Sequence, residues 1–487
     1  MVGLKEILHG INILKITGSQ EIKVNRLQFD SREIEAEDLF VAVKGTQSDG
    51  HNYIRSAVDN GASVVVCEKI PARISERVAC VRVSNSAVAL GKIAANFYGN
   101  PSGTLKLVGV TGTNGKTTIV HLLFNLLRKY GYKAGLLSTT GNIVIDNEIP
   151  ATHTTPDIVQ INRLLAEMVK QGCEYAFMEV SSHALVQYRT AGLTFKGGIF
   201  TNITHDHLDY HKNFGQYINA KKKFFDDLGK DAFALVNADD KNYKIMVQNC
   251  NASISTYALR SVADFKGRII ESLYEGTQLE LDNQEVWTRL IGEFNVYNLL
   301  AVYATASLLG LKKDDLIRFI SKSEPVPGRF ETIRSKGGVI AVVDYAHTPD
   351  ALKNIMNVLV KIKKQNKQLI TVIGAGGDRD KSKRPVMAGI AVTKSDKVIL
   401  TSDNPRTENP QKIIDDMYKG VGKNEQRKVL ILVDRKEAIK IACMLAEKED
   451  VILIAGKGHE TYQEIKGVKY HFDDREVVAG MFEALTM

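Results

Sequence analysis

The chain has 487 residues, of which 44% are hydrophobic and 25% are charged. A chain of this length exceeds what one hydrophobic core supports, so we expect two to four domains. Its longest apolar runs, such as Val451–Ala455, fall far short of the ~20 residues that cross a bilayer, and the first residues lack a signal-peptide pattern. Five scattered cysteines without a C-x-x-C pair indicate reduced thiols. These features argue against a membrane or disulfide-framed protein and predict a cytoplasmic one.

The formal net charge is +8, and the basic residues are spread along the chain rather than clustered. Modules that bind nucleic acid typically concentrate basic residues on one face. A dispersed positive bias is also typical of an enzyme that handles anionic small molecules. We therefore expect small-molecule substrates, no nucleic-acid or membrane partner, and a monomer.

Short β-branched runs alternate with longer helical patterns, which predicts an α/β fold of parallel sheets covered by helices. Residues 1–100 form a first block, with strands expected at Asp38–Val43 and Ala62–Cys67. The Gly- and Pro-containing stretch Tyr98–Gly103 ends this block and is typical of a linker. Residues 101–328 form a second block, with strands expected at Leu105–Val110, Tyr175–Val180, Gly198–Asn202 and Ala232–Asn237.

Residues 329–487 form a third block, in which strands are expected at Val339–Val343, Leu369–Ile373, Lys397–Thr401, Val429–Val433 and Val451–Ala455. Each of these runs is followed by a polar or glycine-rich turn. Ligands of open α/β sheets bind outside the carboxyl ends of the strands. We therefore expect the chemistry of this block to lie in those turns.

The stretch Gly112-Thr-Asn-Gly-Lys-Thr-Thr118 lies between an expected strand and a helix expected over Ile119–Leu127. The usual phosphate-loop pattern, G-x-x-x-x-G-K-[ST], requires a glycine at position 110, where this chain has Val110. The strand–loop–helix context still favours a triphosphate, because backbone N–H groups at a helix N-terminus bind phosphate. Lys116 would contact the β- and γ-phosphates, and the Thr117 hydroxyl would bind Mg²⁺. A glycine-rich turn without a ligand is the alternative.

Two further groups suit phosphoryl transfer, which needs more cations and ligands than one loop supplies. Glu179 ends an expected strand, where it could bind Mg²⁺ or cap the following turn. The stretch Thr201–His211 places three histidines and two aspartates within seven residues. Side chains of this kind at such density indicate a metal or proton-transfer site, although a polar surface loop is the alternative.

Five motifs together resemble the Mur ligase family, in order and over essentially the whole chain: Gly112–Thr118, Glu179–His183, Thr201–Asp209, Gly292–Asn298 and Asp344–His347. The family loop reads G-T-N-G-K-T, which accounts for Val110. The resemblance implies three domains: an N-terminal UDP-binding α/β domain (1–100), a central P-loop parallel-sheet ATPase domain (101–328) and a C-terminal Rossmann-like, amino-acid-binding domain (329–487).

The implied reaction is an ATP-dependent amide synthesis in peptidoglycan precursor synthesis. ATP would phosphorylate the D-glutamate carboxylate of UDP-N-acetylmuramoyl-L-alanyl-D-glutamate, and an amine would attack the acyl phosphate. Phosphorylation supplies the leaving group that a carboxylate lacks. Two Mg²⁺ ions and Lys116 would offset the negative charge.

The resemblance also implies roles for individual residues. Thr117 and Glu179 would bind the first Mg²⁺, and His207 the second together with Lys221, carried as a carbamate formed with CO₂. From charge alone, Lys221 would belong to a solvated helix face, and Lys222 is the alternative register for the carbamate. The catalytic set is Lys116, Glu179, His207 and Lys221. ATP would contact Gly112, Thr113, Asn114, Gly115, Lys116, Thr117, Thr118, Asn295 and Asn298. The UDP-linked substrate would contact Ser31, Thr154, Thr155, Ser181, Gln187 and Arg189, the last as a guanidinium suited to carboxylate or phosphate.

The third block indicates which amino acid is added. Asp403-Asn-Pro-Arg406 is similar to the motif of family members that add meso-diaminopimelate. That amino acid has a distal carboxylate for arginine and a distal ammonium for glutamate, whereas lysine would leave a buried arginine unpaired. The expected contacts are Arg379, Asp403, Asn404, Pro405, Arg406, Gly456 and Glu460. L-Lysine as the acceptor and a folylpolyglutamate synthetase-like ligase are the alternatives, and the latter lacks a counterpart of residues 1–100.

Overall fold

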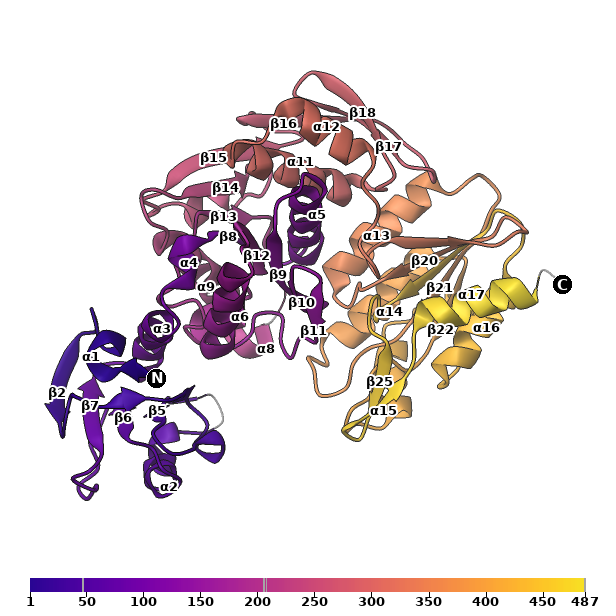
Figure 1. The fold of residues 1–487 in the computed structure, drawn as a ribbon. Helices are drawn as coiled ribbons and strands as arrows, with labels where there is room; N and C mark the ends of the chain where they lie inside the picture. The colour runs from indigo at the N-terminus through magenta and orange to yellow at the C-terminus, as the bar shows by residue number, and fades with distance from the viewer. Residues whose placement is uncertain (46–47, 205, 207, 486–487) are drawn as a thin grey trace.

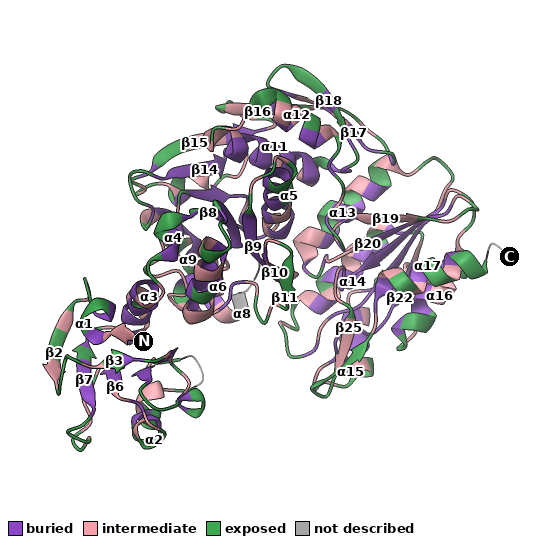
Figure 2. Ribbon diagram, viewed as in Figure 1, coloured by how far each residue is buried: buried purple, intermediate pink, exposed green. Residues whose placement is uncertain are grey.

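The computed structural model describes residues 1–45, 48–204, 206 and 208–485. Three large sheets, each covered by helices, follow one another along the chain, with two further two-stranded sheets formed by β1 and β3 and by β25 and β26 (Figure 1). The predicted α/β class is confirmed. Figure 2 shows that the inner strands of the central and C-terminal sheets, such as β12 and β24, are buried, while outer strands such as β16 and β18 and the outer faces of the helices are exposed.

The N-terminal sheet has the strand order β2-β7-β6-β5-β4, in which β4 to β7 are parallel and β2 is antiparallel at one edge. Apolar residues of α1 and α3 cover one face, and those of α2 cover the other. The elements are β1 (Val2–Gly3), α1 (Leu4–Ile7), β2 (Ile13–Thr17), β3 (Lys23–Val24), β4 (Leu27–Gln28), β5 (Leu39–Val41), α2 (Ile54–Asp59), β6 (Val64–Cys67), β7 (Ala79–Val83) and α3 (Ser86–Phe97).

The stretch expected to be a linker is partly helical. Pro101–Thr104 forms one turn, α4, with proline at its first position and Asn100 before it at φ 53°. Proline suits the first turn of a helix because it has no N–H to leave unpaired. The Ser102 hydroxyl accepts a hydrogen bond from Thr194 N at 3.0 Å, so this turn is fixed to the central domain.

The central sheet has eleven strands in the order β11-β10-β9-β12-β8-β13-β14-β15-β16-β17-β18. The strands β9, β12, β8, β13, β14, β15 and β16 run parallel to one another. Antiparallel ribbons flank them at both edges, β10 with β11 on one side and β17 with β18 on the other, and the sequence did not predict these ribbons. The elements are β8 (Lys106–Thr111), α5 (Lys116–Lys129), β9 (Ala134–Ser138), β10 (Gly141–Val144), β11 (Asn147–Ile149), α6 (Ile158–Lys170), β12 (Tyr175–Glu179), α7 (Ser182–Val186), β13 (Gly197–Phe200), α8 (Leu208–His211), α9 (Phe214–Asp226), β14 (Phe233–Asn237), α10 (Tyr243–Met246), β15 (Ser253–Ala258), β16 (Phe265–Ser272), β17 (Thr277–Leu281), β18 (Gln284–Thr288), α11 (Glu293–Leu308) and α12 (Lys313–Ser321).

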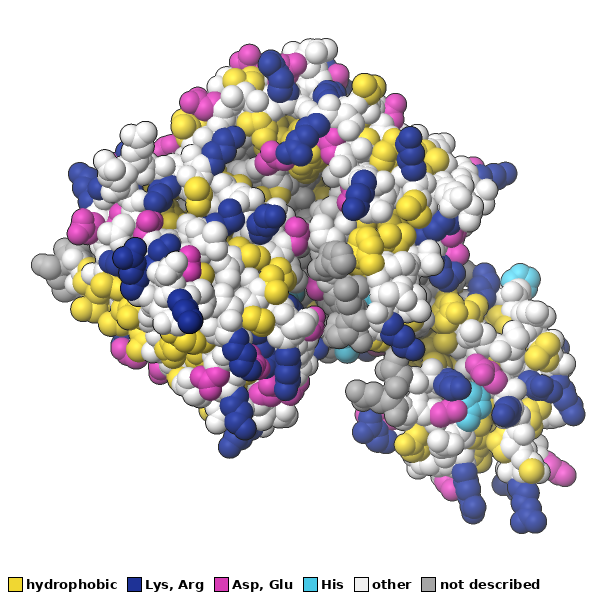
Figure 3. Space-filling model, turned by 180° about the vertical axis from the view of Figure 1, so that it is seen from behind, with side chains coloured by type: hydrophobic (Ala, Val, Ile, Leu, Met, Phe, Trp, Pro, Cys, Tyr) yellow, Lys and Arg dark blue, Asp and Glu magenta, His cyan; other side chains and the backbone are white. Residues whose placement is uncertain are grey.

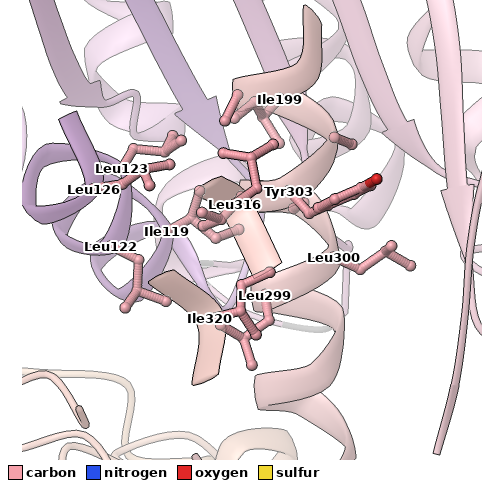
Figure 4. Packing of buried hydrophobic residues seen from close by; sticks show 14 of the residues in the cluster. Ile119, Leu122, Leu123, Leu126, Ile199, Leu299, Leu300, Tyr303, Leu316 and Ile320 are labelled. Atoms are coloured by element: carbon pink, nitrogen blue, oxygen red, sulfur yellow. The ribbon is translucent and has the colours of Figure 1, made fainter. Parts of the chain in front are cut away.

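Helices α5, α11 and α12 cover one face of the central sheet, and α6 and α9 cover the other. Figure 4 shows the first of these cores, to which α5 contributes Ile119 and Leu123, α11 contributes Leu299 and α12 contributes Ile320. Burial of large apolar side chains stabilises the fold by about 1.5–3 kcal/mol for each one. This packing holds α5 in place, and with it the phosphate loop that directly precedes the helix.

The C-terminal sheet has the order β19-β20-β24-β21-β22-β23, parallel except for β19. Helices α13, α14 and α15 cover one face, and α16 and α17 cover the other. The elements are β19 (Glu331–Arg334), β20 (Ile340–Asp344), α13 (Pro349–Ile362), β21 (Leu369–Ile373), α14 (Lys383–Lys394), β22 (Lys397–Leu400), α15 (Pro410–Tyr418), β23 (Val429–Ile431), α16 (Arg435–Leu445), β24 (Val451–Ala455), the hairpin β25 (Tyr462–Ile465) and β26 (Val468–His471), and α17 (Asp474–Ala484).

The surface mixes charges of both signs. On the face shown in Figure 3, lysine and arginine side chains are interspersed with aspartate and glutamate. Across the part of the chain that the structure describes, no helix is both long and apolar enough to cross a membrane.

Candidate active site

One cleft of about 1620 Å³ lies between the central and C-terminal domains. Its lining includes the segments that follow β8, β12 and β13 of one sheet and β20, β21, β22 and β24 of the other. The carboxyl ends of two parallel sheets therefore face the same space, the position at which such sheets bind ligands.

Most of the residues predicted from the sequence line this cleft: Gly112, Thr113, Asn114, Gly115, Lys116, Thr117, Thr118, Thr154, Thr155, Glu179, Ser181, Gln187, Arg189, Lys221, Asn295, Asn298, Arg379, Asp403, Asn404, Arg406, Gly456 and Glu460. Of the described residues, Ser31 and Pro405 lie outside the lining. Ser31 belongs to a 3₁₀ turn of the N-terminal domain, where its carbonyl accepts a hydrogen bond from Asn60. His207 lies outside the described residues.

The structure of the phosphate loop accounts for the position of its glycines. Gly112 has φ 148°, and a Cβ there would lie 1.9 Å from Thr201 Oγ1. Gly115 has φ 89°, and a Cβ there would lie 2.5 Å from Asn298 Oδ1. Val110, by contrast, is a fully buried residue of β8, where a side chain contributes to the core. Glycine is therefore required at 112 and 115 but not at 110.

Two lysines converge on this loop. Lys116 Nζ donates to the carbonyls of Gly112 and Thr113, each at 2.9 Å. Lys221 Nζ, on α9, donates to the same Gly112 carbonyl at 2.9 Å and is 1% exposed. Loss of hydration lowers the pKa of both side chains, and the charge of Lys116 lowers that of Lys221 further. Lys221 therefore has access to the neutral amine, the form that reacts with electrophiles.

Buried side chains with oxygen atoms also lie beside the loop. Glu179 ends β12 and is 1% exposed, and its Oε1 accepts a hydrogen bond from Thr139 N at 2.8 Å. Its charge raises the pKa of Lys116 against the effect of burial. Asn295 and Asn298, in the first turns of α11, are buried and joined by a 3.3 Å hydrogen bond beside Gly115.

Four of the predicted contacts of the UDP-linked substrate, Thr155, Ser181, Gln187 and Arg189, form one hydrogen-bonded network. Thr155 Oγ1 donates to the Glu179 carbonyl at 2.8 Å and accepts from Ser181 N at 3.1 Å. Arg189 donates to the Thr155 carbonyl at 2.7 Å and to Gln187 Oε1 at 2.6 Å. The Thr155 hydroxyl thus links this network to the backbone of Glu179.

Two residues that the sequence did not single out connect the domains. Arg329 Nη2 donates to Thr117 Oγ1 at 3.0 Å, and its guanidinium lies 4.6 Å from the centre of the Tyr345 ring. Asp350, in the first turn of α13, accepts from Asn114 Nδ2 at 3.0 Å and from Thr204 Oγ1 at 3.1 Å. Neither residue carries a local signal in the sequence, because the partners of each are distant along the chain.

The C-terminal side of the cleft is built from loops held by buried charges. Arg406, at φ 52°, donates from Nη1 to the Gly377 carbonyl at 2.7 Å and lies 3.5 Å from Glu464 Oε2. Arg384, with 1% of its side chain exposed, forms a two-bonded pair with Glu408, whose Oε1 accepts from Asp378 N. The loop that carries Arg379 is thereby fixed against the Arg406 loop.

The Arg384–Glu408 pair should make stability depend on pH. Hydrogen bonds from Arg384 lower the pKa of Glu408 from 4.5 to about 2. The stabilisation is therefore present above pH 4.5 and is lost as the pH falls towards 2. We expect Glu408→Gln to lower the free energy of unfolding at pH 7, with a difference from the unchanged protein that shrinks steadily below pH 4. Urea unfolding followed by circular dichroism measures it, and a difference independent of pH would contradict the pairing.

A loop with a phosphate-binding pattern that shares a cleft with the arginine-bearing edge of a second sheet is typical of a nucleotide-dependent enzyme. Family models agree: the Mur ligase middle domain matches residues 110–306, the Mur ligase glutamate ligase domain matches 328–458, and the Mur ligase family catalytic domain matches 23–98. The chain belongs to the Mur ligase family and is an ATP-dependent ligase.

The chain is 55% identical to UDP-N-acetylmuramoyl-L-alanyl-D-glutamate–2,6-diaminopimelate ligase of Bacteroides fragilis, over 98% of this chain and 99% of the relative. A solved structure of a ligase with that name has a TM-score of 0.71 and 33% identity, covering 100% of this chain and 99% of that one. Folylpolyglutamate synthase of Thermotoga maritima shares only the fold, with 15% identity and a TM-score of 0.58 over 76% of this chain.

Proposed function

We propose that this ligase joins an amino group of meso-2,6-diaminopimelate to the D-glutamate carboxylate of UDP-N-acetylmuramoyl-L-alanyl-D-glutamate in peptidoglycan precursor synthesis. ATP is converted to ADP and phosphate. The observation that carries the proposal is the pairing of the phosphate loop with the Arg406 loop across one cleft. The names of the full-length relatives support the same substrates.

The chemistry has two steps. The D-glutamate carboxylate attacks the γ-phosphorus of ATP, forming an acyl phosphate and releasing ADP. The acceptor amine then attacks the acyl carbon, and phosphate leaves from the tetrahedral intermediate with loss of a proton from nitrogen. Lys116 stabilises the phosphate charge, and Arg329, which donates to Thr117, lies where it can stabilise the group in transfer.

The oxygen donors Thr117 and Glu179 fit Mg²⁺, which prefers hydroxyl, carboxylate and water ligands. We propose them for a first ion, and Lys221 as a carbamate with His207 for a second. The neutral amine of Lys221 can add to CO₂ with loss of one proton, which gives an anionic carbamate ligand. Bound Mg²⁺ would supply positive charge to the phosphates.

On the acceptor side, we propose that Arg379 and Arg406 bind the distal carboxylate and that Glu460, Asp403 and the Gly456 carbonyl bind the distal ammonium. L-Lysine would leave Arg406 without its carboxylate partner, which disfavours it as acceptor. Asn404 and Pro405 shape the turn between these charges.

The remaining assignments are proposed on the same basis. The N-terminal domain, residues 1–100, would hold the UDP moiety through Ser31, with residues 101–328 for ATP and 329–487 for the amino acid. We propose that the enzyme acts as a monomer. Free, mostly buried cysteines suit the cytoplasm, where the precursor is expected.

The test is a substrate-omission experiment. ADP formation is measured with ATP, the UDP-linked dipeptide precursor and meso-diaminopimelate, and with each of them left out. We expect full turnover only when all three are present, and mass spectrometry should show a product heavier by one diaminopimelate residue. Turnover that persists without the UDP-linked precursor would contradict the proposal.

A further inference from the structure

A buried lysine lies within the loops proposed to hold the acceptor. Lys457 follows β24, and its side chain is 0% exposed. Its Nζ donates to Asn404 Oδ1 at 3.1 Å and to Glu460 Oε2 at 3.0 Å, and it lies 5.5 Å from the centre of the Tyr462 ring. A buried ammonium is unfavourable unless it is paired and hydrogen-bonded. Lys457 therefore depends on Glu460 for its charge partner, and the same ion pair fixes the position of Glu460.

Lys457 also determines which way the Asn404 amide faces. Asn404 Oδ1 receives hydrogen bonds from Lys457 Nζ and from Glu464 N, the latter at 2.9 Å. Both of those groups can only donate, so the acceptor oxygen must face them and the amide nitrogen must face Glu460. Asn404 Nδ2 donates to Glu460 Oε2 at 2.8 Å.

Lys457 Nζ and Asn404 Nδ2 both donate to the same oxygen of Glu460, Oε2. Its other oxygen, Oε1, accepts no hydrogen bond from any residue that the structure describes, and Glu460 lines the cleft. The carboxylate is thus held by one oxygen and leaves the other for a ligand donor. An ammonium group is the donor that this oxygen would bind most strongly.

Lys457 adds a positive charge to the acceptor end. The cations Arg379, Arg406, Lys457 and Lys469 meet the anions Asp403, Glu460 and Glu464 there. The buried Arg435–Asp474 pair next to these loops adds no net charge. An acceptor that ends in a zwitterionic group brings a carboxylate for these cations, whereas the end of a lysine side chain brings only a further positive charge.

We infer that Lys457 is a positioning and specificity-determining residue, which directs Glu460 Oε1 towards the acceptor and disfavours acceptors that end in a lone ammonium. This inference rests on the proposed function. Lys457 does not contact the reacting atoms. It acts through the orientation of Asn404, the orientation of Glu460 and the net charge that the acceptor meets.

The test compares Lys457→Met, which removes donor and charge, with Lys457→Gln, which keeps a donor but not the charge. kcat/KM is measured for meso-diaminopimelate and for L-lysine, together with KM for ATP. Lys457→Met should raise KM for meso-diaminopimelate by roughly 10–100-fold and lower the preference over L-lysine by at least about tenfold. KM for ATP should stay within about twofold. Lys457→Gln should recover part of the KM but not the preference.

Lys466→Met is the matched control, because Lys466 is an exposed lysine in the adjacent hairpin turn. An unchanged preference in both Lys457 variants would overturn the inference, as would an equal rise in KM for ATP. If Lys457→Met does not fold, the preference of Lys457→Gln decides. Failure of the unchanged enzyme to use meso-diaminopimelate would instead overturn the proposed function, independently of Lys457.

Discussion

Replacing Lys221 with alanine is expected to lower ligase turnover by roughly 10²–10³-fold, the typical cost of losing one group that stabilises charge in the transition state. Lys221 is buried against the Gly112 carbonyl, and burial together with Lys116 lowers its pKa. Such a lysine contributes nothing as a solvated surface cation. It can contribute a negatively charged ligand if CO₂ adds to its neutral amine. Steady-state phosphate release at saturating substrates measures the loss.

Neighbouring lysines provide the controls. Lys223 pairs with Asp227 on the exposed face of α9, so Lys223→Ala should retain turnover and cost at most about 1 kcal/mol of stability. Lys222 pairs with Asp226, and Lys222→Ala tests the alternative register of the carbamate. Added short carboxylates should partly restore Lys221→Ala. A fully active Lys221→Ala, or a larger loss in Lys222→Ala, would contradict the assignment.

Replacing Arg406 with alanine is expected to raise KM for meso-diaminopimelate by roughly 30–1000-fold, the effect of removing one partner from a close charge pair in a binding site. The distal carboxylate would be left without the guanidinium that the Gly377 carbonyl and Glu464 hold in place. KM for ATP should change by less than about twofold, because the phosphate loop lies on the other domain. Initial rates at varied amino acid and ATP concentrations separate the two constants.

Arg427→Ala serves as the control, because Arg427 is an exposed arginine of the same domain that does not line the cleft among the described residues. It should leave both constants unchanged. Arg406→Lys should recover little, since one ammonium cannot reproduce the two-bonded fork of a guanidinium. If Arg406→Ala binds meso-diaminopimelate as well as the unchanged enzyme does, the acceptor assignment is wrong.

Much of the fold could be predicted from local patterns. β12 and β24 are short apolar runs bounded by polar turns, and their observed bounds lie within one residue of the prediction. The strands β10, β11, β17 and β18, in the outer ribbons of the central sheet, were missed because they are short and mix polar with apolar residues, and the edge strands β11 and β18 expose much of their length. The expected linker became α4 because its proline suits the first turn of a helix.

The candidate site also has a part that the sequence predicted and a part that it did not. The phosphate loop and the turns after β22 and β24 carry local motifs, and their residues line the cleft. Asp350, Arg329 and Lys457 were not singled out, since their roles depend on partners that lie on other loops or another domain. Asp350 meets Asn114 from 236 positions away, and Arg329 meets Thr117 from 212. Spacing along a sequence contains no information about such contacts.

The most direct test of the account measures phosphate release with ATP and the UDP-linked dipeptide precursor, adding meso-diaminopimelate, L-lysine or no amine in parallel. The account predicts release that depends on the amine, with kcat/KM at least about 10²-fold higher for meso-diaminopimelate than for L-lysine. Equal rates with the two amines would contradict the acceptor assignment, and phosphate release that no amine accelerates would contradict the ligase itself.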